Sequence, residues 1–399
     1  MTEAKGLRAE MLNKIYFKDA LKGQFPTDAV IEVTSIAPHN IDTSTGNTVE
    51  MTGKTEAMNG HFAYDIGYTV NGKAAVACIV VKAKIHSRQV LKNVRGFYEA
   101  GGTELAETYD FSIPNLLSNT HLREVMIYAE VTDERFKKYT PKIYNTVLDE
   151  QNEVFCFNME LFQNVVQGNK RLPKDWNAEL IGTVMHDMAE VHSVYLNDTA
   201  KIEMRPWCDS VKDMNLSATM KHWNCLLEYL AKDVKDLFTA ERVRLLEEIL
   251  MCFPQQWKAI TQAPLTLTHN NFSPRNMFLQ GGEERLKMKL YDWDMAWVHV
   301  PQRDICEFLT WVTTGKSEDI LHYAEIYRQN LEHSSGRKFP VQEFFEIFEF
   351  ACCDFLFSKI ITAGVIHKHF KKNPDLARRM DTQVAFIKSL KAKGLKKAN

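Results

Sequence analysis

The sequence lacks the features that suit a membrane protein, an exported protein or a nucleic-acid-binding protein. Nowhere in its 399 residues do about 18 apolar residues run together, and the N-terminal stretch "MTEAKGLRAEMLNKIYF" has no continuous apolar segment. Lysine and arginine number 49 against 51 aspartate and glutamate residues, so the formal net charge is only -2. We therefore expect no membrane partner, no nucleic-acid partner and a cytoplasmic location.

The cysteines also lack the spacings that mark a metal site or a disulfide framework. None of the eight belongs to a CxxC pair, and none has a histidine nearby at the spacing of a zinc finger. Disulfide frameworks occur mainly in small secreted chains, whereas this chain is long. We therefore expect reduced, mostly buried thiols.

The composition is that of a globular protein large enough for two domains. Hydrophobic residues make up 45% of the chain and charged residues 25%, with no internal repeat and no low-complexity tract. The pattern changes from strand-like to helix-like after about the first 160 residues. This change predicts an α+β fold with two lobes, a sheet-rich N-terminal lobe at 1–162 and a larger helical C-terminal lobe at 163–399.

In the N-terminal part, residues 61–84 predict a β-hairpin. Apolar residues alternate on both sides of Asn71-Gly72, a pair that favours a tight type I′ turn because both positions need positive φ. A helix is expected from Ser87 up to the Gly101-Gly102 pair. A second helix is expected in "HLREVMIYAEV", and "EVFCFNMELF" is typical of a strand.

The C-terminal part is mainly helical in its pattern. Apolar residues recur at helical spacing from about residue 178, and the remaining helices are expected at 216–236, 240–252, 304–313, 318–333, 341–369 and 375–393. The exception is 265–292, where "LTLTHNN" and "LKMKLYDWD" look like short strands on either side of a loop, with a turn at Gly281-Gly282.

That loop, "THNNFSPRN", contains polar residues suited to phosphoryl transfer. The transfer of a γ-phosphoryl group needs magnesium, a lysine that neutralises phosphates and a residue that orients the acceptor hydroxyl. Magnesium prefers hard oxygen ligands such as the side-chain carbonyl of Asn276 and the carboxylate of Asp292. The sequence therefore favours a magnesium site built on these two residues.

Four stretches together resemble the aminoglycoside phosphotransferase and choline kinase-like family, a branch of the protein-kinase-like fold. The loop "HNNFSPRN" is similar to the family pattern His-Gly-Asp-x-x-Pro-x-Asn, and "LYDWDMAW" to the aspartate segment that follows it. Downstream, "VPQRDICEFL" resembles the segment whose aspartate braces the site, here Asp304. Upstream, "MAEVHSVYL" resembles a helix with a structural histidine near its end, here His192. The order and spacing match over residues 60 to 370.

The resemblance implies ATP and Mg2+ as cofactors and a phosphate-binding lysine paired with a helix glutamate. Lys82 follows "CIVV" in the position of the lysine, and Glu124 in "HLREVMIY" matches the glutamate. Lys84 is the alternative to Lys82, because residues two apart on a strand point to the same face.

For the catalytic loop the resemblance implies that Asn276 and Asp292 hold magnesium. It also implies that His269 braces the loop by hydrogen bonding and that Asp294 is an auxiliary residue for the metal or the backbone. Asn271 occupies the catalytic position, where the family has aspartate. An amide can orient a hydroxyl but cannot take up its proton. Three interpretations follow: a slow or differently arranged kinase, a nucleotide-binding pseudokinase, or an active kinase whose aspartate has been deliberately replaced.

The acceptor of the phosphoryl group is the least specified part of the prediction. The resemblance implies a hydroxyl of a small molecule, such as an alcohol, an amino sugar or a choline-like amine, or a Ser or Thr of a peptide. A peptide acceptor implies a lyase partner that removes the phosphate. In this family the segment 197–260 helps to build the acceptor pocket. The residues there that would suit an amine are Trp207, Asp209, Trp223 and Glu228.

Overall fold

The computed structural model describes residues 5–41, 55–109, 117–163, 165–168, 173–196, 198–281, 285–313 and 317–392. The chain forms two compact units. The first contains Met1–Asn93, Leu117–Val165 and Tyr291–Asp294, and the second contains Val94–Leu116, Val166–Leu290 and Met295–Asn399. The predicted division had a single boundary between residues 162 and 163.

Two segments account for most of the difference from the predicted division, and residues 163–165 also belong to the first unit. Val94–Leu116 groups with the second unit, where helix α4 (Thr103–Thr108) packs against helix α9 (Leu216–Asp233). Tyr291–Asp294 groups with the first unit, where the Asp292 backbone N–H donates to the carboxylate of Glu124. Both assignments depend on contacts between distant parts of the sequence.

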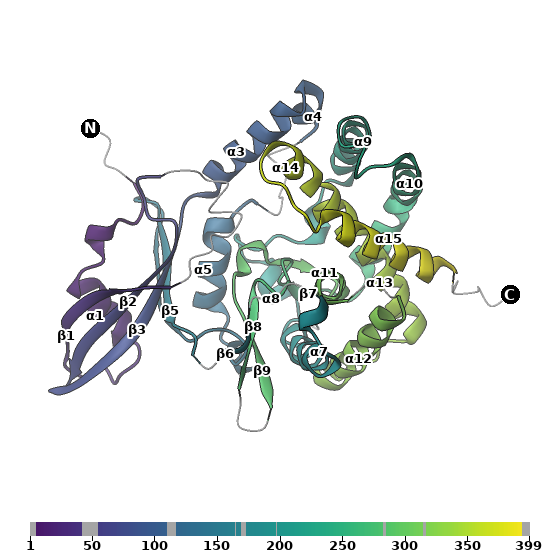
Figure 1. Ribbon diagram of the computed structural model, residues 1–399. Coiled ribbons are helices and arrows are strands. Elements are labelled where there is room, and N and C mark those ends of the chain that lie inside the picture. Colours follow the sequence, from purple (N-terminus) through teal and green to yellow (C-terminus); the bar gives the residue numbers. More distant parts are fainter. Residues whose placement is uncertain are drawn as a thin grey trace. The chain divides into compact units, whose positions relative to one another are not determined.

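The first unit is built on a five-stranded antiparallel sheet (Figure 1). The spatial order is β1-β2-β3-β5-β4, and the strands are β1 (Ile31–His39), β2 (Gly60–Val70), β3 (Lys73–Lys84), β4 (Ile143–Asp149) and β5 (Val154–Glu160). The predicted hairpin is confirmed: β2 and β3 meet at Asn71 and Gly72, whose φ angles are 49° and 79°. The predicted strand at 153–162 is β5.

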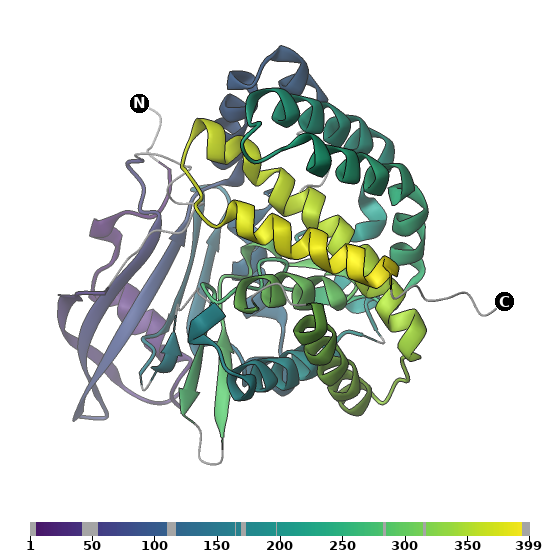
Figure 2. The same cartoon turned by 45° about the vertical axis from the view of Figure 1, so that its right-hand side comes forward.

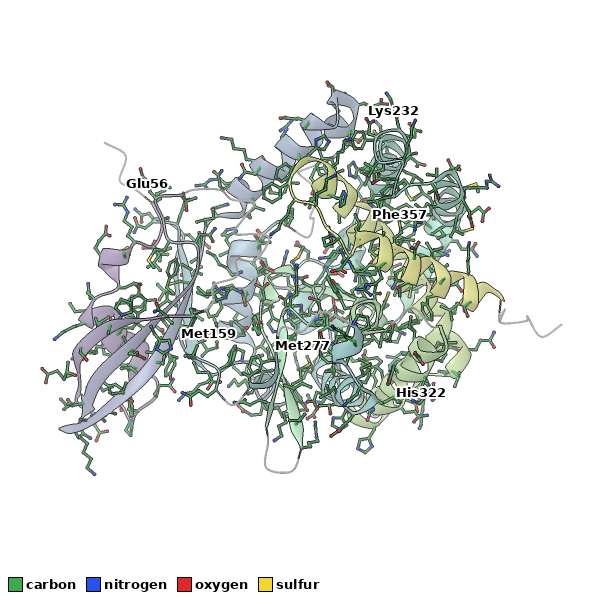
Figure 3. All side chains as sticks on the ribbon, viewed as in Figure 1. Glu56, Met159, Lys232, Met277, His322 and Phe357 are labelled. Carbon is green, nitrogen blue, oxygen red and sulfur yellow. The ribbon has the colours of Figure 1, made fainter. Side chains whose placement is uncertain are left out.

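Helices α1 (Lys14–Lys22) and α5 (Thr120–Glu130) cover opposite faces of this sheet (Figure 1). Phe17 of α1 packs into an apolar cluster with Ile66 and Ile79. Val125 of α5 packs into a second cluster with Val80 and with other side chains, among them Met159, labelled in Figure 3. Alternate residues of β3 after Val80 therefore face α5.

Helix α3 (Ser87–Ala100) confirms the predicted helix start and stop. It begins at Ser87 and ends directly before the Gly101-Gly102 pair, where Gly102 takes a φ of 117°. That left-handed backbone favours glycine and turns the chain into α4. The last helix of the first unit is the short α6 (Glu134–Lys137).

The second unit is mainly helical, which confirms the α+β class. Its longer helices match the predicted set and are α7 (Ala178–Ser193), α9, α10 (Ala240–Gln262), α11 (Gln302–Val312), α12 (Ser317–Ser335), α13 (Val341–Phe355), α14 (Ala363–His369) and α15 (Leu376–Ala392), with a short α8 (Ala200–Glu203). Helix α10 is ten residues longer than predicted, because it continues through Pro254. The predicted helix 341–369 contains a π-helical turn, Leu356–Ile361. Its Phe357, labelled in Figure 3, stacks on the ring of Trp223.

The two short strands predicted around the loop "THNNFSPRN" are present, and each pairs with a strand that was not predicted. Strand β7 (Thr266–Thr268) pairs with β10 (Trp297–His299), and β9 (Leu286–Leu290) pairs with a strand that was not predicted, β8 (Met277–Gly281). Strand β6 (Val165–Gly168) adjoins β8 in the same sheet. Figure 2 shows the β8-β9 hairpin in green beside the teal helix α7, which β9 contacts. Gly281 ends β8, and Gly282 lies outside the described residues.

One continuous helical stretch, Val341–His369, is long and apolar enough to cross a membrane by length and composition alone. Its apolar window has a mean hydropathy of 1.4 and is 61% buried within the protein. Phe344, Phe348 and Phe355 are buried in the core of the second unit. This burial is that of a core helix in a globular protein. All eight cysteines are free thiols and most are buried, as expected.

Candidate functional site

In the first unit, two of the predicted site residues form a buried ion pair. The Lys82 ammonium lies 2.7 Å from a carboxylate oxygen of Glu124, and these side chains are 6% and 0% exposed. Lys82 also donates to the Asp292 carboxylate at 2.5 Å. The Asp292 backbone N–H donates to the other Glu124 oxygen at 2.9 Å. The fold thus brings together one residue each from β3, from α5 and from the segment after β9.

Lys84 belongs to the same cluster. Its ammonium lies 2.8 Å from Glu124 and 3.5 Å from the Asp294 carboxylate. Both lysines therefore face α5 and share one glutamate, because they are two residues apart on β3. Of the two, Lys82 is the one paired with Asp292.

The charges of this cluster are coupled. Burial alone raises the pKa of the Glu124 and Asp292 carboxyls, but the nearby ammonium groups of Lys82 and Lys84 outweigh it, and both pKa values lie below the ordinary range. Burial lowers the pKa of Lys82, yet Asp292 and Glu124 more than compensate and raise it. Both ion-pair partners therefore stay charged at neutral pH.

The pKa of Asp294 shifts in the opposite direction from those of Glu124 and Asp292. Burial, followed by the neighbouring charge of Asp292, raises the pKa of its carboxyl. Its oxygen Oδ1 is buried without a hydrogen-bond partner among the described residues. This oxygen is therefore an atom that a bound cation could use.

The backbone of the Asp292–Asp294 segment is held in place by side chains of the first unit. Asp292 has a φ of 70°, a left-handed conformation that costs energy for a residue other than glycine. The Arg123 guanidinium donates to the Asp294 carbonyl at 2.7 Å, and the Trp293 ring packs on Phe136 with ring centroids 4.8 Å apart. Such strain is typical of functional sites. Arg123, next to Glu124 in the chain, was not predicted from the sequence.

His61 is a second residue that sequence reasoning missed. It lies directly opposite Lys82 in the β2-β3 ladder. Burial, then the charge of Lys82, lowers its pKa to about 4, so its imidazole is neutral at physiological pH. The two-residue turn at Asn71-Gly72 fixes the register of the hairpin, and that register could have identified the pair.

In the second unit, Asp304 anchors the predicted catalytic loop. The backbone N–H groups of His269 and Asn270 donate to its two carboxylate oxygens at 2.6 and 2.7 Å. His192 Nε2 lies 3.1 Å from the same carboxylate, and His192 Nδ1 lies 2.6 Å from the Tyr327 hydroxyl. Burial opposes ionisation of Asp304, but the hydrogen bond with His192 and the nearby His269 lower its pKa overall.

Two side chains brace the loop around Asn271. The Asn271 backbone N–H donates to His269 Nδ1 at 3.2 Å, and its carbonyl accepts a hydrogen bond from Asn276 Nδ2 at 2.8 Å. Since the amide nitrogen of Asn276 is used in this way, its carbonyl oxygen is the atom left for a ligand. Asn270 takes a φ of 54°, at the position where the family pattern has glycine.

The Asn271 side chain is half-buried and makes no hydrogen bond with the described residues. Its backbone is thus held on both sides, while its amide group has no intramolecular role among those residues. An acceptor hydroxyl could use this amide as a hydrogen-bond partner.

The residues suggested for an amine pocket do not form one cluster of accessible side chains. Trp223 is buried and packs against Phe253 and Phe357, with ring centroids 4.9 and 5.2 Å apart. Glu228, five residues along the same helix, is exposed, and Trp207 is buried. The tryptophan on α9 therefore fills the helical core, which corrects the expectation that it lines a pocket.

No protein-family model and no curated protein sequence matches the chain. Among solved structures, it is similar to an ethanolamine kinase from Plasmodium vivax at 11% identity, with 90% of this chain and 83% of that chain covered and a TM-score of 0.47. It is also similar to the choline kinase LicA from Streptococcus pneumoniae at 11% identity, with 94% of this chain and 98% of that chain covered and a TM-score of 0.45. A third similar structure is the GDP complex of aminoglycoside 2'-phosphotransferase-IIIa, at 12% identity, with 96% of this chain and 99% of that chain covered and a TM-score of 0.46. These neighbours are small-molecule kinases of the protein-kinase-like fold.

Proposed function

We propose that this chain is an ATP- and Mg2+-dependent phosphotransferase that moves a γ-phosphoryl group to the hydroxyl of a small molecule. The observation that carries the proposal is the buried contact of Lys82 with Glu124 and Asp292. Burial of Glu124 with two lysines, beside the strained backbone of Asp292, costs stability. A role of these residues in binding phosphates would explain why this cost is tolerated.

The donor atoms suit a magnesium ion. Asp292 and Asp294 offer carboxylate oxygens, one of them buried without a hydrogen-bond partner among the described residues. In the second unit, the side-chain oxygen of Asn276, directly before β8, is also a hard donor of the kind that magnesium prefers. Magnesium, when bound with ATP, neutralises charge on the phosphate oxygens.

The lysines supply the remaining positive charge. Lys82 stays protonated because its pKa is raised, and Glu124 fixes its ammonium and that of Lys84 at the surface of the sheet. We assign Lys82 to the phosphates of ATP and leave Lys84 as its neighbour on the same face. Fixed charges of this kind stabilise a transition state without having to reorganise.

Asn271 is assigned to the acceptor hydroxyl. Its amide accepts a hydrogen bond from that hydroxyl and orients it, but does not remove the proton. Loss of a general base typically slows a reaction by about 10²- to 10⁴-fold, so we expect slow transfer by the chain as it stands. Pro274, which resembles the proline of the small-molecule kinases, favours a small acceptor over a peptide. For a peptide Ser or Thr, a lyase partner would remove the phosphate.

A second candidate function is favoured by the same residue. With Asn271 in the catalytic position, the protein could bind a nucleotide or a partner as a pseudokinase scaffold without transferring phosphate. The two functions differ in one result, which is whether aspartate at position 271 produces transfer.

The test is transfer of labelled γ-phosphate from Mg-ATP into a fractionated extract of the source cells, with the unsubstituted chain and its Asn271→Asp variant compared side by side. We expect labelling that is about 10²-fold or more stronger with Asn271→Asp. The matched control is the double variant Asn271→Asp/Asp292→Asn, which should lose the signal. Mg-ATP binding by both forms without any transfer would overturn the proposal in favour of a scaffold.

The labelled fraction also identifies the acceptor. Label in a low-molecular-weight fraction supports the small-molecule class. Label in a peptide fraction, removed when a lyase from the same cells is added, would overturn that class but not the phosphotransferase activity.

A further inference from the structure

We propose that His39, Asp65 and Cys78 form a binding site for Zn2+ on the sheet of the first unit. His39 ends β1, Asp65 lies in β2 and Cys78 lies in β3. The ligand atoms, one from each side chain, all lie within 4.8 Å of one another. The site is independent of the phosphotransferase activity proposed above.

The strand register places the three side chains on one face. Asp65 is directly opposite Cys78 in the β2-β3 ladder. His39 is directly opposite Ala63, the residue two positions before Asp65 on the same face. The cluster is therefore fixed by two antiparallel ladders rather than by the conformation of a loop.

The separations are close to those that a tetrahedral zinc site needs. His39 Nδ1 lies 3.1 and 3.0 Å from the two carboxylate oxygens of Asp65. With metal–ligand bonds of about 2.0–2.3 Å, neighbouring ligand atoms in a tetrahedral site lie about 3.3–3.8 Å apart. Small side-chain rotations can therefore open the cluster around an ion without moving the strands.

The donor set selects the metal. An imidazole nitrogen, a thiolate sulfur and a carboxylate oxygen are the three ligand types that Zn2+ uses in proteins. Magnesium and calcium avoid sulfur ligands. Three protein ligands leave one position of a tetrahedral ion for water. All three residues are only partly buried, with side-chain exposures of 35% for His39 and 44% for Asp65, so an ion can enter from solvent.

The site is separate from the proposed magnesium site. Cys78 precedes Lys82 by four residues on the same face of β3, a distance of about 13 Å along the strand. The Cys78 carbonyl accepts a hydrogen bond from the backbone N–H of Leu161, just beyond the end of β5. A bound ion would link β1, β2 and β3 on the face of the sheet that also carries Lys82. It would also hold the end of β1 against β2.

Cobalt(II) is the probe for this site, because it takes up tetrahedral zinc sites and gives a sulfur-to-metal charge-transfer absorption when a thiolate is bound. We expect the unsubstituted chain to bind one Co2+ with this absorption and to release it to Zn2+. Cys78→Ser should abolish the absorption. Cys252→Ser, which changes an exposed cysteine in α10, is the matched control and should leave it unchanged.

Two further variants separate metal binding from the hydrogen bonds that already join the three residues. His39→Gln and Asp65→Asn keep Cys78 but should weaken Zn2+ binding by about tenfold or more. Zn2+ should raise the thermal midpoint of the natural chain and not that of Cys78→Ser. A cobalt spectrum without thiolate absorption, or one unaffected by Cys78→Ser, would overturn the proposal and leave a cluster joined by hydrogen bonds alone.

Discussion

Asp304 shows how a single buried carboxylate can determine the shape of a functional loop. Two consecutive backbone N–H groups and one histidine converge on it, and all of these groups are buried. Removal of the charge would leave a backbone donor facing an amide N–H2 group. Its role is therefore to position the loop, whatever acceptor the protein uses.

Asp304→Asn should lower the free energy of unfolding by about 1.5–3 kcal/mol, since hydrogen bonds to a buried charged acceptor are lost. The pKa of Asp304 is lowered in the folded state, so its stabilising contribution is present above the unfolded value of about 3.9 and is lost as pH falls through the folded value. Urea unfolding at pH 7 and at about pH 3 should show a gap between natural chain and variant that narrows in acid.

The matched control is Asp198→Asn, which breaks a surface pair with Lys201 in the same unit. It should change stability by less than about 0.5 kcal/mol at either pH. An equal loss in both variants would contradict the anchoring role of Asp304.

At the residue scale, the sequence predicted groups that lie close together in the chain and missed those that do not. The loop from His269 to Asn276 was recognisable because its residues are adjacent. His39, Asp65 and Cys78 come from three strands and have no motif spacing, so local patterns do not indicate that these side chains lie together. Arg123 was missed because its partner is a backbone carbonyl, which leaves no trace in the sequence.

At the scale of elements, the β2-β3 hairpin sets the position of Lys82. The turn at Asn71-Gly72 fixes the register, and the register places Lys82 opposite His61 and on the face of the sheet that packs against α5. A change of register by one residue would turn both lysines to the other face. The turn therefore determines the position of Lys82, although it lies at the other end of β3.

Gly72→Ala should destabilise the protein by about 1–2 kcal/mol, because Gly72 has a φ of 79°. A methyl group there meets no atom within 4 Å, so the cost is conformational and not steric. Gly182→Ala is the control: it also has open space but lies within helix α7, where alanine should stabilise by about 0.5–1 kcal/mol. Thermal unfolding should move in opposite directions for the two variants, and shifts of the same sign would contradict this interpretation.

The elements that were predicted correctly carry a strong local signal. Apolar alternation on both sides of Asn71-Gly72 predicted β2 and β3, and Ser87 with the Gly101-Gly102 pair predicted the ends of α3. Each of these signals acts within a few residues. The pairing of β7 with β10 was missed because the partners are about 30 residues apart and each has three residues. The predicted end of helix α10 was too early because Pro254 weakens a helix locally. In the structure the helix continues past Pro254, and the buried side chains of Phe253 and Trp257 stabilise it there.

At the scale of the whole molecule, each unit has its own set of proposed functional residues. The first carries the lysines, Glu124, Asp292 and Asp294, and the second carries Asn271, Asn276 and the Asp304 anchor. The division into a sheet-rich and a helical part was predictable from the change of periodicity. The assignment of Tyr291–Asp294 to the first unit was not, since it depends on the hydrogen bond between the Asp292 backbone and Glu124.

The most direct measurement is the affinity for ATP by isothermal titration calorimetry, with and without Mg2+, for the natural chain, for Asp292→Asn and for Asp19→Asn. Asp19 is a control because it is 52% exposed and pairs with Lys22 on the surface, away from the cluster around Lys82 in the sequence. We predict one ATP per chain in the presence of Mg2+, and binding weaker by about tenfold or more in Asp292→Asn but unchanged in Asp19→Asn. Equal affinities in all three proteins, or no ATP binding by the natural chain, would contradict the claim that the cluster around Lys82 is a site for Mg-ATP.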